Sequence, residues 1–97
     1  MNKQHPIPFD KVNITGGFWK DRIALNESVT LDSVRRRFED TGRFSALSCE
    51  WKQGEPDRPH FFYDSDAAKW MEAAAYVLER KNDKRLESYV EDLIDRI

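Results

Sequence analysis

The sequence predicts an all-α fold, and three observations support that prediction. Long segments repeat apolar residues at spacings of three and four, as one face of an α-helix does, whereas only residues 12–14 alternate as a strand would. Two helical segments within residues 65–97 are joined by a tight turn, which predicts a helical hairpin. The first of these segments is apolar on nearly all sides, a pattern typical of a helix buried among other helices.

We expect an extended arm over residues 1–17, before any helix. Pro6 and Pro8 favour extended backbone, and residues 12–14 alternate apolar and polar until Gly16–Gly17 breaks the pattern. The arm should therefore contain an extended segment or a short edge strand. The glycine pair lacks the flanking residues of a phosphate-binding loop, so nucleotide binding is not predicted.

Residues 18–42 are predicted to be helical, in two pieces. The first piece covers residues 18–27 and has three side chains able to reach a core: Phe18, Trp19 and Ile23. Thr30 is the expected N-cap of a clearer helix over residues 31–40, and Gly42 is expected to end it. That helix has one apolar face, formed by Leu31, Val34 and Phe38.

A long loop over residues 43–64 contains most of the residues that indicate a function. A segment of this length without periodicity is unusual in a compact domain and tends to be functional or disordered. Disorder is disfavoured because disordered segments lack aromatic residues. This loop contains Phe44, Trp51, Phe61, Phe62 and Tyr63. Rings beside carboxylates and an imidazole suit a carbohydrate, because rings stack on the C–H face of a sugar and carboxylates accept hydrogen bonds from its hydroxyl groups.

The last predicted unit is the hairpin of residues 65–97. Asp64 or Ser65 can cap its first helix, with Asp64 favoured, and Asn82 or Asp83 can cap its second. The second helix is amphipathic, and its apolar face is formed by Leu86, Tyr89, Val90, Leu93, Ile94 and Ile97.

The first helix of the hairpin sets how large the complete domain should be. Trp70 and Met71 are expected to be core residues, and Glu72 is expected to pair with Lys69 or Tyr76. One hairpin cannot cover both faces of a helix that is apolar nearly all round. The sequence therefore predicts part of a larger helical domain.

Composition excludes several classes of function. With 16 basic and 18 acidic side chains, the net charge of -2 gives no reason to expect nucleic acid or a membrane surface as a partner. No apolar run approaches the roughly 18 residues of a membrane span, and no signal peptide is recognisable, so a cytoplasmic location is expected. The single cysteine, Cys49, can form neither an internal disulfide nor a structural zinc site alone.

Several blocks of the sequence share a pattern with one known family. They include VNITGGFW at 12–19, TGR at 41–43, WKQG at 51–54 and PHFFYDSDAAKWMEAAAY at 59–76. Through these blocks the chain resembles, from about Val12 to Ile97, the N-terminal segment of glycoside hydrolase family 127, the β-L-arabinofuranosidases. The resemblance implies an (α/α)6 barrel, of which residues 1–97 would be the N-terminal part: the arm and the first helical hairpins.

The resemblance also implies a chemistry. Members of the family look like retaining enzymes in which zinc holds a cysteine thiolate as the nucleophile, with glutamates as metal ligand and acid/base. No residue of this chain matches those positions, and Cys49 is not assigned the nucleophile's role. We therefore expect no catalytic residue and no metal ligand here, zinc only in the parent enzyme, and no hydrolase activity from the chain alone.

Five residues are candidates for binding a sugar. His60 can hydrogen-bond a hydroxyl group, Asp66 can accept hydrogen bonds from one, and three rings can stack: Trp51, Phe62 and Tyr63. Each has a purely structural alternative. A loop histidine often fixes backbone, aromatic side chains often attach a loop to the core, and a carboxylate near a helix start interacts with the helix dipole.

Two functions follow from the sequence. In the first, the chain supplies substrate-binding residues to a glycoside hydrolase whose partner is a carbohydrate. In the alternative, it is a freestanding helical module that binds itself or another protein. Exposed apolar helix faces would favour self-association.

Overall fold

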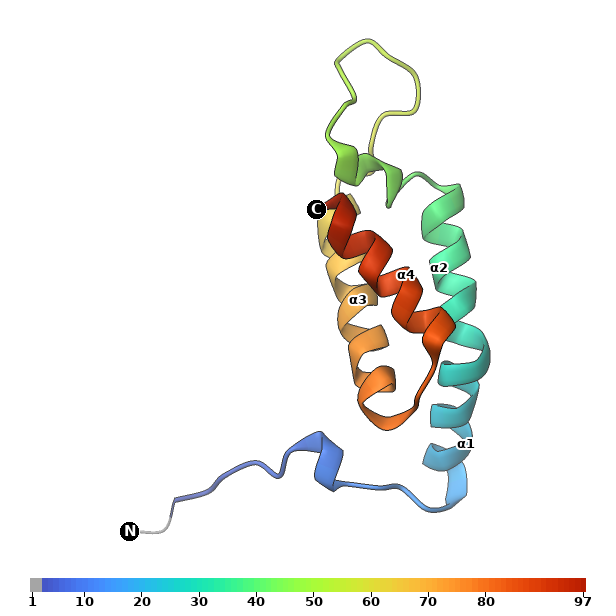
Figure 1. Cartoon of the computed structure of the whole chain (residues 1–97), viewed down its shortest axis with the longest axis vertical. Coiled ribbons are helices and arrows are strands. Elements are labelled where there is room, and N and C mark those ends of the chain that lie inside the picture. Colours follow the sequence, from blue (N-terminus) through green and yellow to red (C-terminus); the bar gives the residue numbers. More distant parts are fainter. Residues whose placement is uncertain (1–2) are drawn as a thin grey trace.

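The computed structural model describes residues 3–97, and this part of the chain is helical without any β-strand. Its helices are α1 (Gly17–Leu25), α2 (Leu31–Asp40), α3 (Tyr63–Arg80) and α4 (Lys84–Arg96). Shorter elements are the 3-10 helices η1 (Phe9–Lys11) and η3 (Ser45–Ser48) and the π-helical segment η2 (Asn26–Thr30). Figure 1 shows α1 and α2 as one long rod beside α3, with α4 packed across them and the loop projecting from one end. The predicted all-α class is confirmed.

The N-terminal arm is extended but does not form a strand. Val12 has extended backbone angles, φ -112° and ψ 128°, and it follows the 3-10 turn η1. The edge-strand alternative is wrong, because the described residues offer no second strand to pair with residues 12–14. The first two residues of the predicted arm lie outside the described residues.

The rod from α1 to α2 is continuous, so the prediction that Thr30 caps a separate helix is wrong. Thr30 has helical angles, φ -63° and ψ -45°, and its side chain makes no capping hydrogen bond. Neither glycine nor proline interrupts residues 18–40, and nothing else stops the helix. The Leu31 N–H bonds to the Asn26 carbonyl, which is the wider spacing of a π-helical turn.

Gly42 ends α2, as predicted. It has φ +77°, a left-handed conformation that glycine adopts without steric cost. The Arg43 N–H bonds to the Phe38 carbonyl at 2.9 Å, and the Gly42 N–H bonds to the Glu39 carbonyl at 3.3 Å. This pair of bonds is a Schellman motif, and it turns the chain from α2 into the loop.

The core lies where α2, η3, α3 and α4 meet, and Trp70 is at its centre. Trp70 is only 3% exposed, and its indole N–H donates to the Leu31 carbonyl at 2.9 Å. The Phe44 ring packs edge-on against Trp70, with the ring centroids 5.8 Å apart. The buried cluster consists of Leu31, Phe44, Ala67, Trp70, Ala74, Val77, Leu86 and Leu93. Trp70 is thus confirmed as a core residue, and Met71 packs against the cluster from a half-buried position.

The two helices of the hairpin begin in different ways. Asp83 caps α4, because its carboxylate accepts from the Leu86 N–H at 3.0 Å. Helix α3 starts at Tyr63, earlier than predicted, and its N-cap residue Phe62 makes no side-chain capping bond. Asp64 is therefore not the N-cap; it lies in the first turn and accepts from the Ser65 N–H at 2.8 Å.

On the exposed side of α3, one predicted pair is present. The Tyr76 hydroxyl donates to a Glu72 carboxylate oxygen at 3.2 Å, so Glu72 has the partner that the helical spacing suggested. No helix in the described residues is long and apolar enough to cross a membrane.

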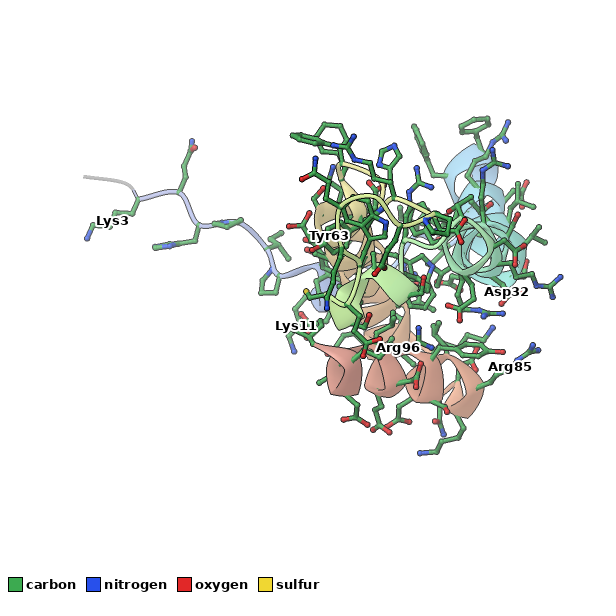
Figure 2. The ribbon with its side chains drawn as sticks, turned by 90° about the horizontal axis from the view of Figure 1, so that it is seen from above. Lys3, Lys11, Asp32, Tyr63, Arg85 and Arg96 are labelled. Carbon is green, nitrogen blue, oxygen red and sulfur yellow. The ribbon has the colours of Figure 1, made fainter. Side chains whose placement is uncertain are left out.

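Exposed apolar side chains lie on the arm, on α1, in the loop at Phe61 and Phe62, and at the end of the chain, but not on the Trp70 side of α3. Ile94 and Ile97, predicted on the apolar face of the last helix, are exposed because no described element packs over them. Residues 3–22 are all exposed, including Phe18 and Trp19, which the pattern had allowed to reach a core; Ile23 is half-buried. Figure 2 shows the arm with Lys3 extending away from the helices. Phe9 is the arm residue that packs on α3, with its ring edge-on to Tyr76 at 4.7 Å. The chain's own α2 and α4 thus cover the face of α3 that the sequence left without partners.

The core assignment predicts a large stability difference between two tryptophan variants. Trp70→Ala should lower the free energy of unfolding by about 3–5 kcal/mol, because it leaves a cavity and removes the hydrogen bond to the Leu31 carbonyl. Trp19→Ala, at a site 66% exposed, should change it by less than about 0.5 kcal/mol. Urea unfolding followed by far-UV circular dichroism measures both, and similar losses would show that Trp70 is not the central core residue.

The cap assignment predicts a second difference. Asp83→Ala should reduce stability by about 0.5–2 kcal/mol, since the Leu86 N–H loses its acceptor. Asn82→Ala is the matched control and should stay within about 0.5 kcal/mol of the parent chain. The same urea titration decides, and an equal loss in the Asn82 variant would contradict the assignment of the cap.

Candidate functional site

The candidate site is a hollow of about 360 Å³ between η3, the long loop and the start of α3, called the loop hollow below. It is lined by Ala46, Cys49, Trp51, Arg58, Pro59, His60, Phe61 and Tyr63. Three of the five residues predicted to bind sugar are therefore brought together here, namely Trp51, His60 and Tyr63. The other two, Phe62 and Asp66, are not among its lining residues.

The loop that carries the hollow is held mainly by its own hydrogen bonds. The Trp51 indole N–H donates to the Glu55 carbonyl at 3.2 Å and to the Pro56 carbonyl at 3.1 Å. The Glu55 N–H bonds to the Lys52 carbonyl at 3.1 Å, and Gly54 takes φ +94° in this turn. Residues 52–58 are all exposed, so the turn closes on itself and not on the core. Trp51 thus fixes the loop with its N–H while its ring lines the hollow.

His60 is oriented by the backbone that follows it. Its Nδ1 accepts from the Phe62 N–H at 3.1 Å, and its carbonyl accepts from the Tyr63 N–H at 3.0 Å. In the neutral ring the nitrogen that accepts is unprotonated, so the hydrogen is on Nε2. His60 therefore combines both roles that the sequence left open: it fixes backbone, and it keeps one N–H available as a donor.

Tyr63 is the first residue of α3, and its hydroxyl lies beside Cys49. The Cys49 thiol raises the pKa of Tyr63 above its usual value, and burial and the Asp64 carboxylate act in the same direction. A tyrosine hydroxyl is protonated at neutral pH at its ordinary pKa as well, so Tyr63 can donate a hydrogen bond. Cys49 has φ +58°, the left-handed region that residues other than glycine seldom occupy, and its thiol lies 3.6 Å from the Leu47 carbonyl.

Asp66 already has a partner in this structure. The Arg43 Nε donates to its carboxylate at 2.8 Å, and the two side chains are only 19% and 22% exposed. Arg43 also donates to the Thr41 hydroxyl at 2.7 Å. This pair joins the beginning of the loop to the first turn of α3. The carboxylate predicted to accept hydrogen bonds from a sugar is thus occupied by an arginine 23 residues earlier in the chain.

Phe62 lies next to the hollow and is largely exposed. Its ring packs edge-on against Phe61, with centroids 5.0 Å apart, and lies 5.9 Å from the His60 ring. Phe62 therefore packs near the His60 ring without lining the hollow itself.

Arg58 and Cys49 line this site but were not among the residues predicted to bind a sugar. Arg58 is two residues before the candidate His60, and this position could have marked it as a further candidate. Because Asp66 lies elsewhere, no carboxylate lines the loop hollow, and its polar side chains are hydrogen-bond donors.

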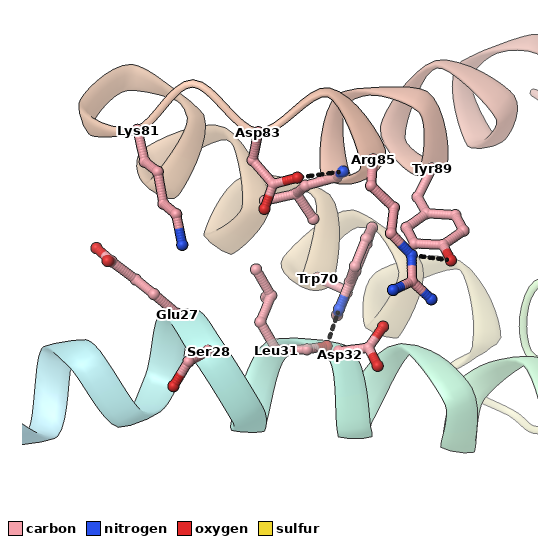
Figure 3. A pocket seen from close by; sticks show the side chains of 10 residues that line it. Glu27, Ser28, Leu31, Asp32, Trp70, Lys81, Asp83, Arg85 and Tyr89 are labelled. Carbon is pink, nitrogen blue, oxygen red and sulfur yellow. Dashed lines mark hydrogen bonds between the residues drawn. The ribbon is translucent and has the colours of Figure 1, made fainter.

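A second hollow, of about 290 Å³, lies between the rod and the start of α4 (Figure 3). Figure 3 shows the side chains of Lys81 and Glu27 extending toward each other across its opening. The other charged groups have structural partners. Asp83 caps α4, the Arg85 Nε donates to the Tyr89 hydroxyl at 2.9 Å, and Arg35 lowers the pKa of Asp32. This hollow is a gap between helices that is lined by several charged side chains.

The described residues do not form a metal site. No group of three or more histidine, cysteine, aspartate or glutamate side chains within residues 3–97 could hold a metal ion. Cys49 and His60 line the same hollow but are too few for the four ligands that structural zinc takes. The zinc implied by the resemblance therefore does not fit the residues present here.

Comparison with known proteins gives one match. The family model described as "Beta-L-arabinofuranosidase, GH127 catalytic domain" matches residues 11–97. A search of curated proteins and a search of solved structures found no significant match. The matched range contains the rod, the loop hollow and the α3–α4 hairpin. Since the match covers nearly all of the sequence, this chain belongs to glycoside hydrolase family 127, the β-L-arabinofuranosidases.

Proposed function

We propose that the chain is the N-terminal part of a GH127 catalytic domain and binds part of a carbohydrate substrate in the loop hollow. The observation that carries this proposal is the meeting of Trp51, His60 and Tyr63 around one hollow, in a chain that belongs to a glycosidase family. The hollow's volume, about 360 Å³, falls within the range of roughly 300–1,000 Å³ typical of small-molecule sites.

The lining residues have distinct tasks in this proposal. The Trp51 ring stacks on the C–H face of a sugar, since its N–H is occupied by loop carbonyls. The His60 Nε2–H and the Tyr63 hydroxyl donate to oxygen atoms of the sugar. None of these residues breaks a glycosidic bond. The chain's residues do not fit a zinc site, and no step of the proposal runs through the metal.

The barrel arrangement is the second part of the proposal. The short connection between α3 and α4 gives an antiparallel hairpin of the kind that repeats in helical barrels. Helix α1 has apolar side chains on several sides but no buried residue. A helix with this pattern normally packs between neighbouring helices. Further helices of an (α/α)6 barrel would cover Phe18, Trp19 and Leu25.

The alternative function, a helical module that associates with itself, is favoured by the same exposed apolar side chains on α1. Sedimentation and a thermal melt separate the two. A discrete oligomer with a single cooperative melt supports the module, and a concentration-dependent mixture of sizes supports an incomplete barrel.

The binding proposal predicts a loss of affinity when the His60 donor is removed. Titration of the chain with an L-arabinofuranose oligosaccharide, followed by amide and indole NMR, should shift the Trp51 indole signal in a saturable way. His60→Ala should weaken binding by about tenfold, the value of one hydrogen bond. His5→Ala, in the exposed arm, is the control and should bind as the parent does. A parent chain without saturable shifts would contradict the proposal.

The geometry predicts that Asp66 acts on stability and not on sugar affinity. Asp66→Asn should lower the free energy of unfolding by about 1.5–3 kcal/mol, because the half-buried Arg43 guanidinium loses its anionic partner. Asp92→Asn, which removes a more exposed ion pair with Arg96, should cost about 1 kcal/mol or less. Saccharide affinity, measured below the unfolding transition, should be unchanged in both. A selective loss of affinity in the Asp66 variant would restore this carboxylate as a sugar ligand.

A further inference from the structure

The loop hollow is rich in donors and poor in acceptors. Among its lining side chains, Arg58 carries a positive charge, His60 presents an N–H, and Tyr63 presents a hydroxyl. No aspartate or glutamate lines it. The acids adjacent to lining residues in the sequence are Glu50, Asp57 and Asp64, and the Asp64 carboxylate accepts from the Ser65 N–H. A neutral sugar offers both donors and acceptors, and among the lining side chains its hydroxyl hydrogens would meet only uncharged acceptors, such as the Tyr63 hydroxyl oxygen.

Arg58 is available for a ligand. Within residues 3–97 it makes no ion pair and no side-chain hydrogen bond, whereas Arg35, Arg36, Arg43 and Arg96 are each paired with a carboxylate. Its place is set by the closed turn before it, which the Trp51 indole fixes. A guanidinium presents its donors as a rigid fork that matches the two oxygens of a carboxylate.

The acids of this region lie around a neighbouring hollow. That hollow is lined by Glu39, Asp40 and Asp57, and it shares Ala46, Trp51, Arg58 and Pro59 with the loop hollow. The acids therefore belong to one hollow, and His60 and Tyr63 belong to the other. An anionic group is attracted to the His60 and Tyr63 side, and it is repelled by the carboxylates on the other side.

We propose that the loop hollow selects a saccharide that carries a carboxylate, as a uronic acid does, with Arg58 holding the carboxylate and His60 and Tyr63 donating to its oxygens. This inference rests on the proposed carbohydrate binding and adds the class of sugar. Trp51 supplies the stacking surface for the ring, so binding requires the sugar and the carboxylate together. Arg58 is the residue that determines the preference.

A matched pair of ligands tests the inference on the full chain. Methyl galacturonide and methyl galactoside differ at one carbon, and acetate supplies the carboxylate alone. NMR titration near neutral pH should give an affinity about tenfold higher for the galacturonide than for the galactoside, and negligible binding of acetate. The preference should fall in about 1 M sodium chloride, because screening weakens an exposed charge pair.

Variants of Arg58 assign the preference to that side chain. Arg58→Gln should remove the preference, so that the galacturonide binds no more tightly than the galactoside. Arg58→Lys should keep a reduced preference, since an ammonium group cannot form the two-point contact. Arg37→Gln, which removes an exposed arginine of α2, is the control and should keep the full preference.

The outcomes separate this inference from the proposed function. Equal binding of both glycosides would overturn the carboxylate preference and leave carbohydrate binding standing. Binding of acetate as tight as that of the galacturonide would also overturn it, because the hollow would then be a general anion site. If neither glycoside binds, the proposed function fails and the inference fails with it.

Discussion

The hydrogen bond from the Trp70 indole to the Leu31 carbonyl is the contact on which the rest of the structure depends. It joins α3 to the rod at a point where the ring is otherwise enclosed by apolar side chains. Such a buried N–H needs a partner. The bond therefore fixes both the position of α3 along the axis of α2 and the distance between the two helices. Phe44 packs on the same ring, and α4 covers the cluster through Leu86 and Leu93. This one core therefore positions η3 and α3, the two elements between which the loop hollow lies.

The loop illustrates how a small core can hold a site that it does not enclose. Its two ends are anchored, at Phe44 in the core and at the half-buried pair of Arg43 with Asp66. Between them the Trp51 indole closes the exposed turn through backbone carbonyls. The result is an open hollow with defined donors and an aromatic wall. In the proposed function, this hollow binds one part of a sugar ligand.

Local features were predictable from the sequence, and features set by distant partners were not. Gly42 was identified correctly, and the cap of α4 was narrowed to Asn82 or Asp83, because these roles depend on neighbours within one helical turn. Thr30 was wrongly predicted to be an N-cap, because a cap requires that a helix begin there. The chain instead continues from α1 to α2 through the π-helical turn. Asp66 stands among aromatic residues in the sequence, and nothing local shows that Arg43 will reach it across 23 positions. The apolar character of α3 was recognised, but not that the chain's own α2 and α4 cover its Trp70 side.

Hydrogen exchange of the three tryptophan indole N–H groups tests the central contact most directly. The account predicts slow exchange at Trp70, which opens only when the core opens, and fast exchange at Trp19, which is 66% exposed. Trp51, bonded within an exposed turn, should be intermediate. Exchange at Trp70 as fast as at Trp19 in the folded chain would contradict the account, because the rod and α3 would then lack the bond that sets their positions and that of the loop hollow.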